Sequence, residues 1–249
     1  MSSNINDILK QLDNLNTTSG ISVYVPSLKK AVRFKNLNLK QQKELLKSSI
    51  DDTVTKLSFS TKFYNILQEN AIDVIDINKL FTFDRSIIAL ALRANGLNAI
   101  YNNINLNDVV VQSQTIAIEQ SSLQTTINIQ DLTIVLEAPT LGTDRDINLT
   151  TMAKVKNISE KDVKTLIGEL FVHEIVKFIK SVTFKTESGE QVISFAELKA
   201  DDKINIAEQL PSIAINKILD FIKSYRSFES LFTTLNNVSI DVDSSFFSV

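Results

Sequence analysis

The chain of 249 residues contains no cysteine and a single histidine, His173. The absence of thiols excludes disulfides, thiolate metal sites and cysteine nucleophiles, and it leaves the redox compartment open. Glycine (5) and proline (3) are scarce for a chain of this length. Turns and loops must therefore rely on Asn, Asp and Ser.

Long apolar runs and a secretion signal are also missing. No run approaches the ~18 apolar residues that a membrane-spanning helix needs. The N-terminal sequence MSSNINDILKQLDNLNTT lacks the basic and apolar regions of a secretory signal, so we expect an intracellular protein, at least when it is made. The net charge is −3, with acidic and basic residues interspersed. Nucleic-acid binding needs clustered basic residues, which makes nucleic acid a poor candidate partner.

Sequence motifs of catalysis are absent as well, since there is no Gly-x-Gly-x-x-Gly, P-loop or Gly-x-Ser-x-Gly. His173 follows Glu169 by four residues, so both share a helical face and could hold a metal or act as base and acid. A zinc-protease helix would need a second histidine. The sequence therefore favours a plain ion pair on an exposed helix flank, and we expect no cofactor and no metal.

Three carboxylate clusters have ordinary structural interpretations. Asp51-Asp52 and Asp201-Asp202 stand at predicted helix boundaries, where carboxylates complement the helix dipole. Asp144 and Asp146 lie beside Arg145 in a predicted loop, but the ligand pattern of a calcium loop is missing.

The apolar pattern, with 43 % hydrophobic and 22 % charged residues, is that of a folded globular protein. We predict an α+β fold of helical segments with antiparallel β-hairpins, in which a central β-rich portion lies between two helical portions. The predicted segments are an N-terminal amphipathic helix or arm (1–20), a hairpin plus helices (21–107), a β-rich hairpin region (108–150), and a helical portion with hairpins and a Phe-rich C-terminal tail (151–249).

In the first half, alternation predicts a hairpin that turns at Pro26-Ser27 and continues through Val32 and Phe34. Asn38 can cap a following helix, with Leu39 and Leu45 on its apolar face and Gln41 in solvent. Helical spacing predicts two more helices, at 58–70 and 85–95. The second is apolar all round and should be buried.

In the second half, alternation predicts three or four strands between 108 and 136, beginning with Val109 and Val111 and including Ile116 and Ile118. Thr140 to Asn148 reads as an exposed loop. A long helix should start after Ser159-Glu160, followed by a hairpin at Ser188-Gly189. Two helices then follow, at 196–210 and 213–225, before a last hairpin around Val238 and Ile240.

The two ends of the chain are candidates for partner binding. An apolar stripe marks the N-terminal helix, which precedes a Ser19-Gly20 break that would let it move as an arm. Phe246 and Phe247 form the C-terminal tail, where they either pack in the core or anchor a partner. A docking role predicts that removal of residues 246–249 lowers stability little. The candidate partner-binding residues are Ile5, Leu9, Leu12, Phe246 and Phe247.

A set of short motifs runs in order along most of the chain. They are the Pro26-Ser27 turn with Val32-Arg33-Phe34, the run 39–46, the run 77–80 with Phe83-Asp84, the run 90–94, the run 179–182, the turn 188–190, Leu210-Pro211 and Phe246-Phe247. In this order they resemble the baseplate hub protein family of T-even-type contractile-tailed bacteriophages.

This resemblance implies a non-enzymatic part of, or assembly factor for, the central hub of the tail baseplate. Its partners would be other phage baseplate or hub proteins, with a homo-oligomer as a further option. Its location would be the host cell cytoplasm during assembly or the virion tail baseplate. The family also implies Cys-x-x-Cys pairs in two hairpins, but residues 115–130 and 232–241 contain none. No metal role carries over, so apolar strand pairing must hold these hairpins.

Two alternatives come from other classes of protein. One is a hydrolase or metal-dependent enzyme that uses His173 with nearby carboxylates, which requires His173 to face a pocket. The other is a general cytoplasmic scaffold protein unrelated to phages.

Overall fold

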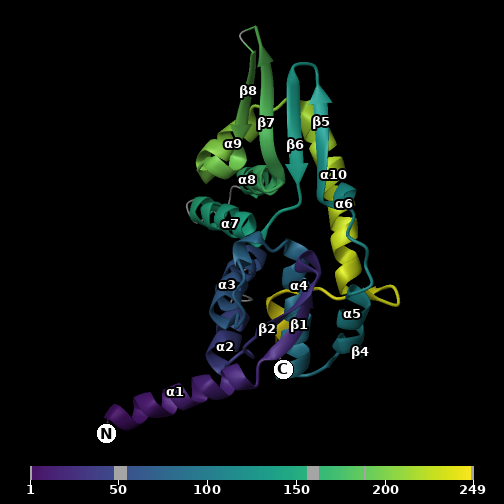
Figure 1. Cartoon of the computed structure of the whole chain (residues 1–249). Helices are drawn as coiled ribbons and strands as arrows, with labels where there is room; N and C mark the ends of the chain where they lie inside the picture. The colour runs from purple at the N-terminus through teal and green to yellow at the C-terminus, as the bar shows by residue number, and fades with distance from the viewer. Residues whose placement is uncertain (1, 48–54, 156–162, 188, 248–249) are drawn as a thin grey trace. The chain divides into compact units, whose positions relative to one another are not determined.

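The protein has a mixed α+β fold, as predicted, in a computed structural model that describes residues 2–47, 55–155, 163–187 and 189–247 (Figure 1). The chain divides into two compact units. Unit 1 comprises Met1–Ile116 and Phe232–Val249, and unit 2 comprises Ala117–Leu231. Asp51-Asp52 and the predicted helix start at Ser159-Glu160 lie outside the described residues. Among the described residues, no helix is long and apolar enough to span a membrane.

Unit 1 combines a hairpin with helices and two very short hairpins. Its elements are α1 (Ser2–Thr18), β1 (Ile21–Val25), η1 (Pro26–Leu28), β2 (Lys30–Phe34), α2 (Leu39–Lys47), α3 (Thr55–Asn70), η2 (Ile77–Lys79), α4 (Thr82–Gly96), β3 (Ile100–Tyr101), β4 (Ile104–Asn105), α5 (Leu106–Ser113), β9 (Thr234–Leu235), β10 (Val238–Ser239) and η5 (Ser244–Phe247).

The β1–β2 hairpin forms at the predicted position, with Val23 opposite Val32 and both side chains buried. Asn38 caps α2 as predicted, since its Oδ1 accepts the Gln41 amide at 2.9 Å. The prediction that Gln41 lies in solvent is wrong. Its side chain is buried and exchanges hydrogen bonds with the amide of Asn70, at 2.8 and 3.2 Å.

Asparagine builds two of the tight turns, in agreement with the shortage of glycine. Asn102 and Asn103 between β3 and β4 both have positive φ, and so do Asn236 and Asn237 between β9 and β10. Two consecutive residues with positive φ match the right-handed twist of a two-residue hairpin, and Asn tolerates this conformation better than other non-glycine residues.

Helix α4 is the buried helix of unit 1, and a carboxylate at its first turn ties it to the hairpin. Asp84 is fully buried; its Oδ2 accepts the Phe81 amide at 2.9 Å, and its Oδ1 accepts the Ser27 amide at 3.0 Å. Burial raises the pKa of Asp84 from 3.8 to about 6, although Ser27, through its side chain and its amide, and the amide of Phe81 oppose this shift.

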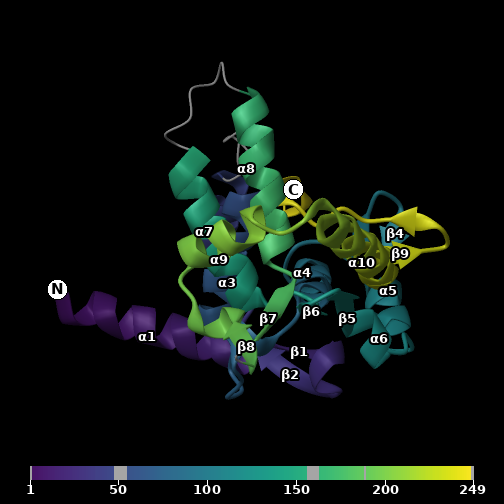
Figure 2. The same ribbon diagram turned by 90° about the horizontal axis from the view of Figure 1, so that it is seen from above.

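Unit 2 is built on a four-stranded antiparallel sheet with strand order β5-β6-β7-β8. Its elements are α6 (Gln120–Leu123), β5 (Gln124–Ile129), β6 (Leu132–Glu137), α7 (Leu141–Val155), α8 (Val163–Val176), β7 (Ile179–Thr186), β8 (Gly189–Ser194), η3 (Phe195–Glu197), α9 (Ala200–Glu208) and α10 (Ser212–Ser230). Ile134 in β6 pairs with Ile127 and Val182 of the neighbouring strands, and all three are buried. Helices α7, α8 and α9 pack together (Figure 2), and α10 packs along β5 and α6.

Two local predictions in the central region are wrong. Residues 106–113 form helix α5 instead of a strand, and Ile116 and Ile118 lie in no strand. Asn105 caps this helix by accepting the Asn107 amide at 3.1 Å. Leu106 and Val109 are buried at helical spacing, whereas Val111 is 62 % exposed. The cap and the three-residue spacing therefore prevail over the strand propensity of valine.

The predicted loop at Thr140 to Asn148 is also wrong, because helix α7 begins at Leu141. The face of α7 that is buried follows helical spacing but is partly polar. It consists of Leu141, Asp144, Ile147, Asn148, Thr151 and Val155. The spacing of apolar residues in the sequence does not reveal such a face, because half of its positions are polar.

We expect Asp84→Asn to remove a pH dependence of stability. The folded pKa lies above the unfolded value, so the folded chain binds the proton more tightly. This contribution is fully present below about pH 3.8 and is lost as the pH rises through about 6. Relative to Asp84→Asn, the wild type should thus lose about 3 kcal/mol of unfolding free energy between these limits.

Urea unfolding of both chains at several pH values measures this difference. Asp108→Asn is the matched control, because Asp108 occupies the first turn of α5 but is exposed. A wild-type-minus-variant difference for Asp84→Asn that stays flat with pH would show that burial does not govern this carboxyl.

Candidate functional site

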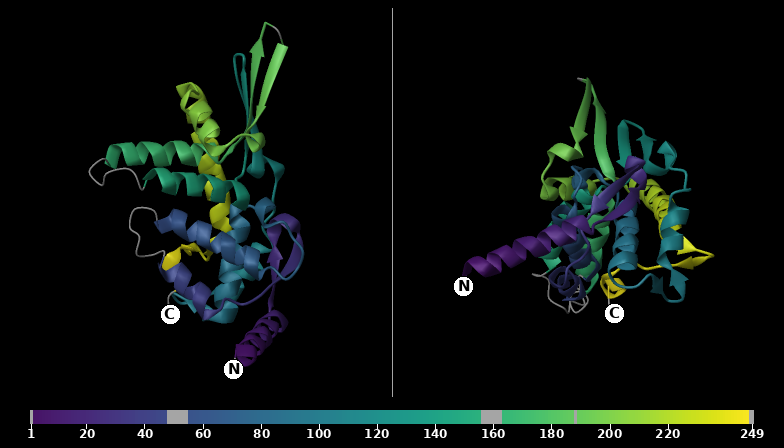
Figure 3. Two further views of the ribbon diagram at one scale, coloured as in Figure 1. Left: turned by 90° about the vertical axis from the view of Figure 1, so that its left-hand side faces the viewer. Right: turned by 60° about the horizontal axis from the view of Figure 1, so that its bottom comes forward.

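The N-terminal helix α1 carries the largest exposed apolar stripe among the described residues. Five aliphatic side chains of this helix are half or more exposed, namely Ile5 (61 %), Ile8 (50 %), Leu9 (57 %), Leu12 (51 %) and Leu15 (64 %). Figure 3 shows α1 extending away from the rest of unit 1. Covering the exposed part of one such side chain is worth about 1 kcal/mol, so the stripe as a whole is suited to docking.

The junction between α1 and the hairpin is a packed corner. Lys35 Nζ lies 2.8 Å from Asp13 Oδ1, and Asn36 Nδ2 donates to the Ser19 carbonyl at 3.1 Å. A Cβ on Gly20 would lie 2.5 Å from Ile72 Cδ1 and 2.8 Å from the carbonyl oxygen of Phe34. Gly20 is therefore required for close approach of the chain to the hairpin.

The C-terminal phenylalanines lie in the core of unit 1. Phe246 and Phe247 are both fully buried. The Phe247 ring centroid lies 5.7 Å from that of Phe63 and 6.2 Å from that of Phe59. Of the two alternatives for the tail, the structure shows the core, and in this structure neither ring is available to a partner.

Arg93 of α4 holds the C-terminal end in place. Its guanidinium donates from Nη1 to the Phe246 carbonyl and lies 4.8 Å from the centroid of the Tyr101 ring. The Phe246 ring in turn contacts Tyr101 edge-on, with centroids 5.0 Å apart. Burial lowers the pKa of Arg93. A buried arginine that stacks on aromatic rings and bonds a carbonyl fixes both its neighbours.

His173 in α8 pairs with Glu169 as the spacing predicts, with 3.3 Å between Nε2 and Oε2. The prediction of an exposed flank is wrong, because His173 is only 1 % exposed. Burial and the nearby cation of Lys154 lower the pKa of His173, although Glu169 opposes them. The physical reason is tertiary packing, because Thr151 of α7 contacts His173 and α9 also packs against α8.

Thr151 Oγ1 contacts His173 Nδ1, which places a hydroxyl, an imidazole and a carboxylate in sequence. The hydroxyl of Thr151 also donates to the Ile147 carbonyl at 2.7 Å, so its proton is directed away from the imidazole. Thr151 is itself 1 % exposed. This arrangement gives no support to an activated nucleophile.

A second ionic group, buried at Lys177 and Asp144, joins α7, α8 and α10. Lys177 Nζ lies 2.9 Å from Asp144 and 3.2 Å from Glu174, and Glu174 accepts from Arg226 at 2.9 Å. Burial favours a lower pKa for Lys177, but the carboxylates of Asp144 and Glu174 outweigh it and raise the pKa. This group was not predicted from the sequence. The three-residue spacing of Glu174 and Lys177 was its only local signal.

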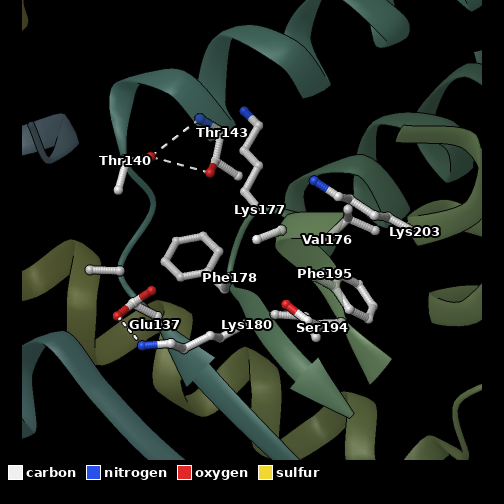
Figure 4. Close-up of a pocket in the computed structure, with 13 residues that line it drawn as sticks. Glu137, Thr140, Thr143, Val176, Lys177, Phe178, Lys180, Ser194, Phe195 and Lys203 are labelled. Carbon is white, nitrogen blue, oxygen red and sulfur yellow. Dashed lines mark hydrogen bonds and ion pairs between the residues drawn. The ribbon is translucent and has the colours of Figure 1, made fainter. Parts of the chain in front are cut away.

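A pocket of about 170 Å³ in unit 2 lies beside this group (Figure 4). Lys177, Lys180 and Lys203 line it together with Glu137, Thr140 and Thr143. Lys180 is neutralised by Glu137 at 2.8 Å, and Lys177 by Asp144. His173 is not among the residues of this pocket. Within the described ranges, no group of three or more His, Asp or Glu side chains could hold a metal ion.

Comparison with known proteins gives one match. The model of a family described as T4 bacteriophage base plate protein matches residues 18–237. No curated protein and no solved structure shows a significant match. The matched range contains both the Ser27–Asp84 contact and the four-stranded sheet, whereas α1 precedes it almost entirely.

We expect Phe247→Ala to destabilise the protein by about 3–5 kcal/mol, because it empties a fully buried aromatic site. Thermal or urea unfolding measures the effect. Phe171→Ala is the control, since Phe171 is 45 % exposed and its removal leaves no comparable cavity. If Phe247→Ala unfolds at the wild-type midpoint, the ring does not belong to the core in solution.

Proposed function

The chain belongs to the T4 bacteriophage base plate protein family, and from this we propose that it is a non-enzymatic subunit or assembly factor of the baseplate hub. The observation that carries the proposal is the family match over most of the chain. Its partners are then other baseplate or hub proteins, and its place is the host cytoplasm during assembly or the baseplate of the virion. Membership also removes the reason to consider a scaffold unrelated to phages.

Protein–protein contact is the mode of action that the described surface supports best. The stripe of α1, which includes Ile5, Leu9 and Leu12, is the surface that we propose for contact with another subunit. The Asp13–Lys35 ion pair and the packing of Gly20 attach α1 to the rest of unit 1, so the helix presents its stripe in a defined direction. Phe246 and Phe247 support this contact only by completing the core of unit 1.

The competing proposal, an enzyme that uses His173, has less support. A general base must lie within hydrogen-bond reach of the substrate proton it removes. His173 and Thr151 are each 1 % exposed, and both α7 and α9 pack against the helix that carries His173. The buried ions of unit 2 are therefore assigned to the stability of the helical layer.

Deletion of residues 2–18 should abolish assembly of infectious particles without unfolding the body. The reason is that α1 presents its stripe to solvent, while the core of unit 1 is made by other elements. Plating of a phage that lacks the gene, complemented by each version of the chain, measures assembly. Melting curves of the purified chains establish whether the body is intact. Wild-type plating by the deleted chain would refute the proposed role of α1.

His173→Gln should complement the same phage as well as the wild type does, once the amount of folded chain is matched. Gln is close to His in length and retains hydrogen-bonding groups toward Thr151 and Glu169. Loss of a general base costs typically 10²–10⁴ in rate. A folded His173→Gln chain that fails to complement would favour the enzyme.

A further inference from the structure

The spacing of the apolar residues in α1 defines the geometry of its partner. With Ile5 as position a of a heptad, Ile8 is d, Leu12 is a and Leu15 is d. Alternating intervals of three and four residues form the seam of a coiled coil. Each of these four side chains is half or more exposed, so the seam has no occupant within the described chain. The stripe thus fits another helix lying along it.

The polar residues of α1 are placed to suit this seam. The three charged residues Asp7, Lys10 and Asp13 fall at positions c, f and b, which point away from a coiled-coil partner. Asp13 uses its outward position to bind Lys35 of the body. The attachment of α1 to the rest of unit 1 therefore leaves positions a and d of the heptad exposed.

The positions beside the seam favour an identical partner. Positions e and g normally carry charges that select a particular partner by complementary pairing. In α1 these positions include Asn4, Leu9, Gln11, Asn16 and Thr18, all uncharged. Two copies of α1 thus bring no like charges together, and the same apolar residues face each other. A partner shared by the whole family would be expected to contact the matched residues 18–237, which α1 precedes.

We propose that the subunit bound by the stripe of α1 is a second copy of this chain, joined through α1 in a short homotypic coiled coil. This inference rests on the proposed docking role of α1 and names its occupant. The seam spans two heptads, so association is weak and concentration-dependent. In an assembly with several copies side by side, the same contact would be strengthened by high local concentration.

The test is the molar mass of the full chain as a function of concentration. Light scattering or sedimentation from about 1 to 200 µM covers the range of weak association. We expect the wild-type mass to rise from that of the 27.9 kDa monomer to at least double. Leu12→Asp places a charge in the seam and should weaken association by more than about tenfold.

Asn14→Asp is the matched control, because it adds the same charge to the same helix at the outward position c. It should associate within about twofold of the wild type. Melting curves should be alike for all three chains, since Leu12 and Asn14 are both exposed. A wild type that stays monomeric throughout, or a Leu12→Asp chain that associates as well as the wild type, would overturn the inference.

Capture of purified baseplate proteins separates this inference from the proposed function. If the chain remains monomeric but binds a baseplate protein, and Leu12→Asp abolishes that binding, the occupant is heterologous and only the homotypic inference fails. If neither self-association nor capture depends on Leu12, the docking role of α1 fails as well.

Discussion

The buried carboxylate of Asp84 is the contact on which the organisation of unit 1 depends. It satisfies two backbone amides, one at the start of its own helix α4 and one, Ser27, in the turn of the β1–β2 hairpin, 57 residues away in sequence. Unpaired amides buried at either place would each cost about 1–3 kcal/mol. A single side chain thus joins the buried helix to the hairpin. Helix α1 precedes the hairpin in the chain and is linked to it through Gly20.

In unit 2, ion pairs join the helices to one another. Lys177 stands between Asp144 of α7 and Glu174 of α8, and Arg226 of α10 binds the same glutamate. Breaking such a buried group by removing one partner leaves an uncompensated charge, which is more costly than the pair itself is stabilising. Together with the His173–Glu169–Thr151 group, these contacts account for the burial of Asp144 and Thr151 on α7.

The two ends of the chain have opposite roles in this fold. The aromatic C-terminal residues are enclosed by Phe59, Phe63, Tyr101 and Arg93 and complete a core. The aliphatic stripe of the N-terminal helix is left in solvent, and it is the surface that we propose for partner contact. A well-packed unit 1 that presents the exposed stripe of α1 agrees with the contact role that we propose for this member of a base plate protein family.

Local patterns in the sequence determined the elements whose signals are short-range. The hairpin around Pro26, the helices α1, α3, α4, α9 and α10, and the asparagine turns follow from period, caps and backbone preferences within a few residues. The tertiary structure alone decided that Val109 lies in a helix, that α7 buries Asp144, that His173 is enclosed and that Phe246 is core. The spacing of apolar residues indicates which residues share a face of a helix or strand. Burial depends on which of these faces pack against each other, and such contacts join residues far apart in the chain.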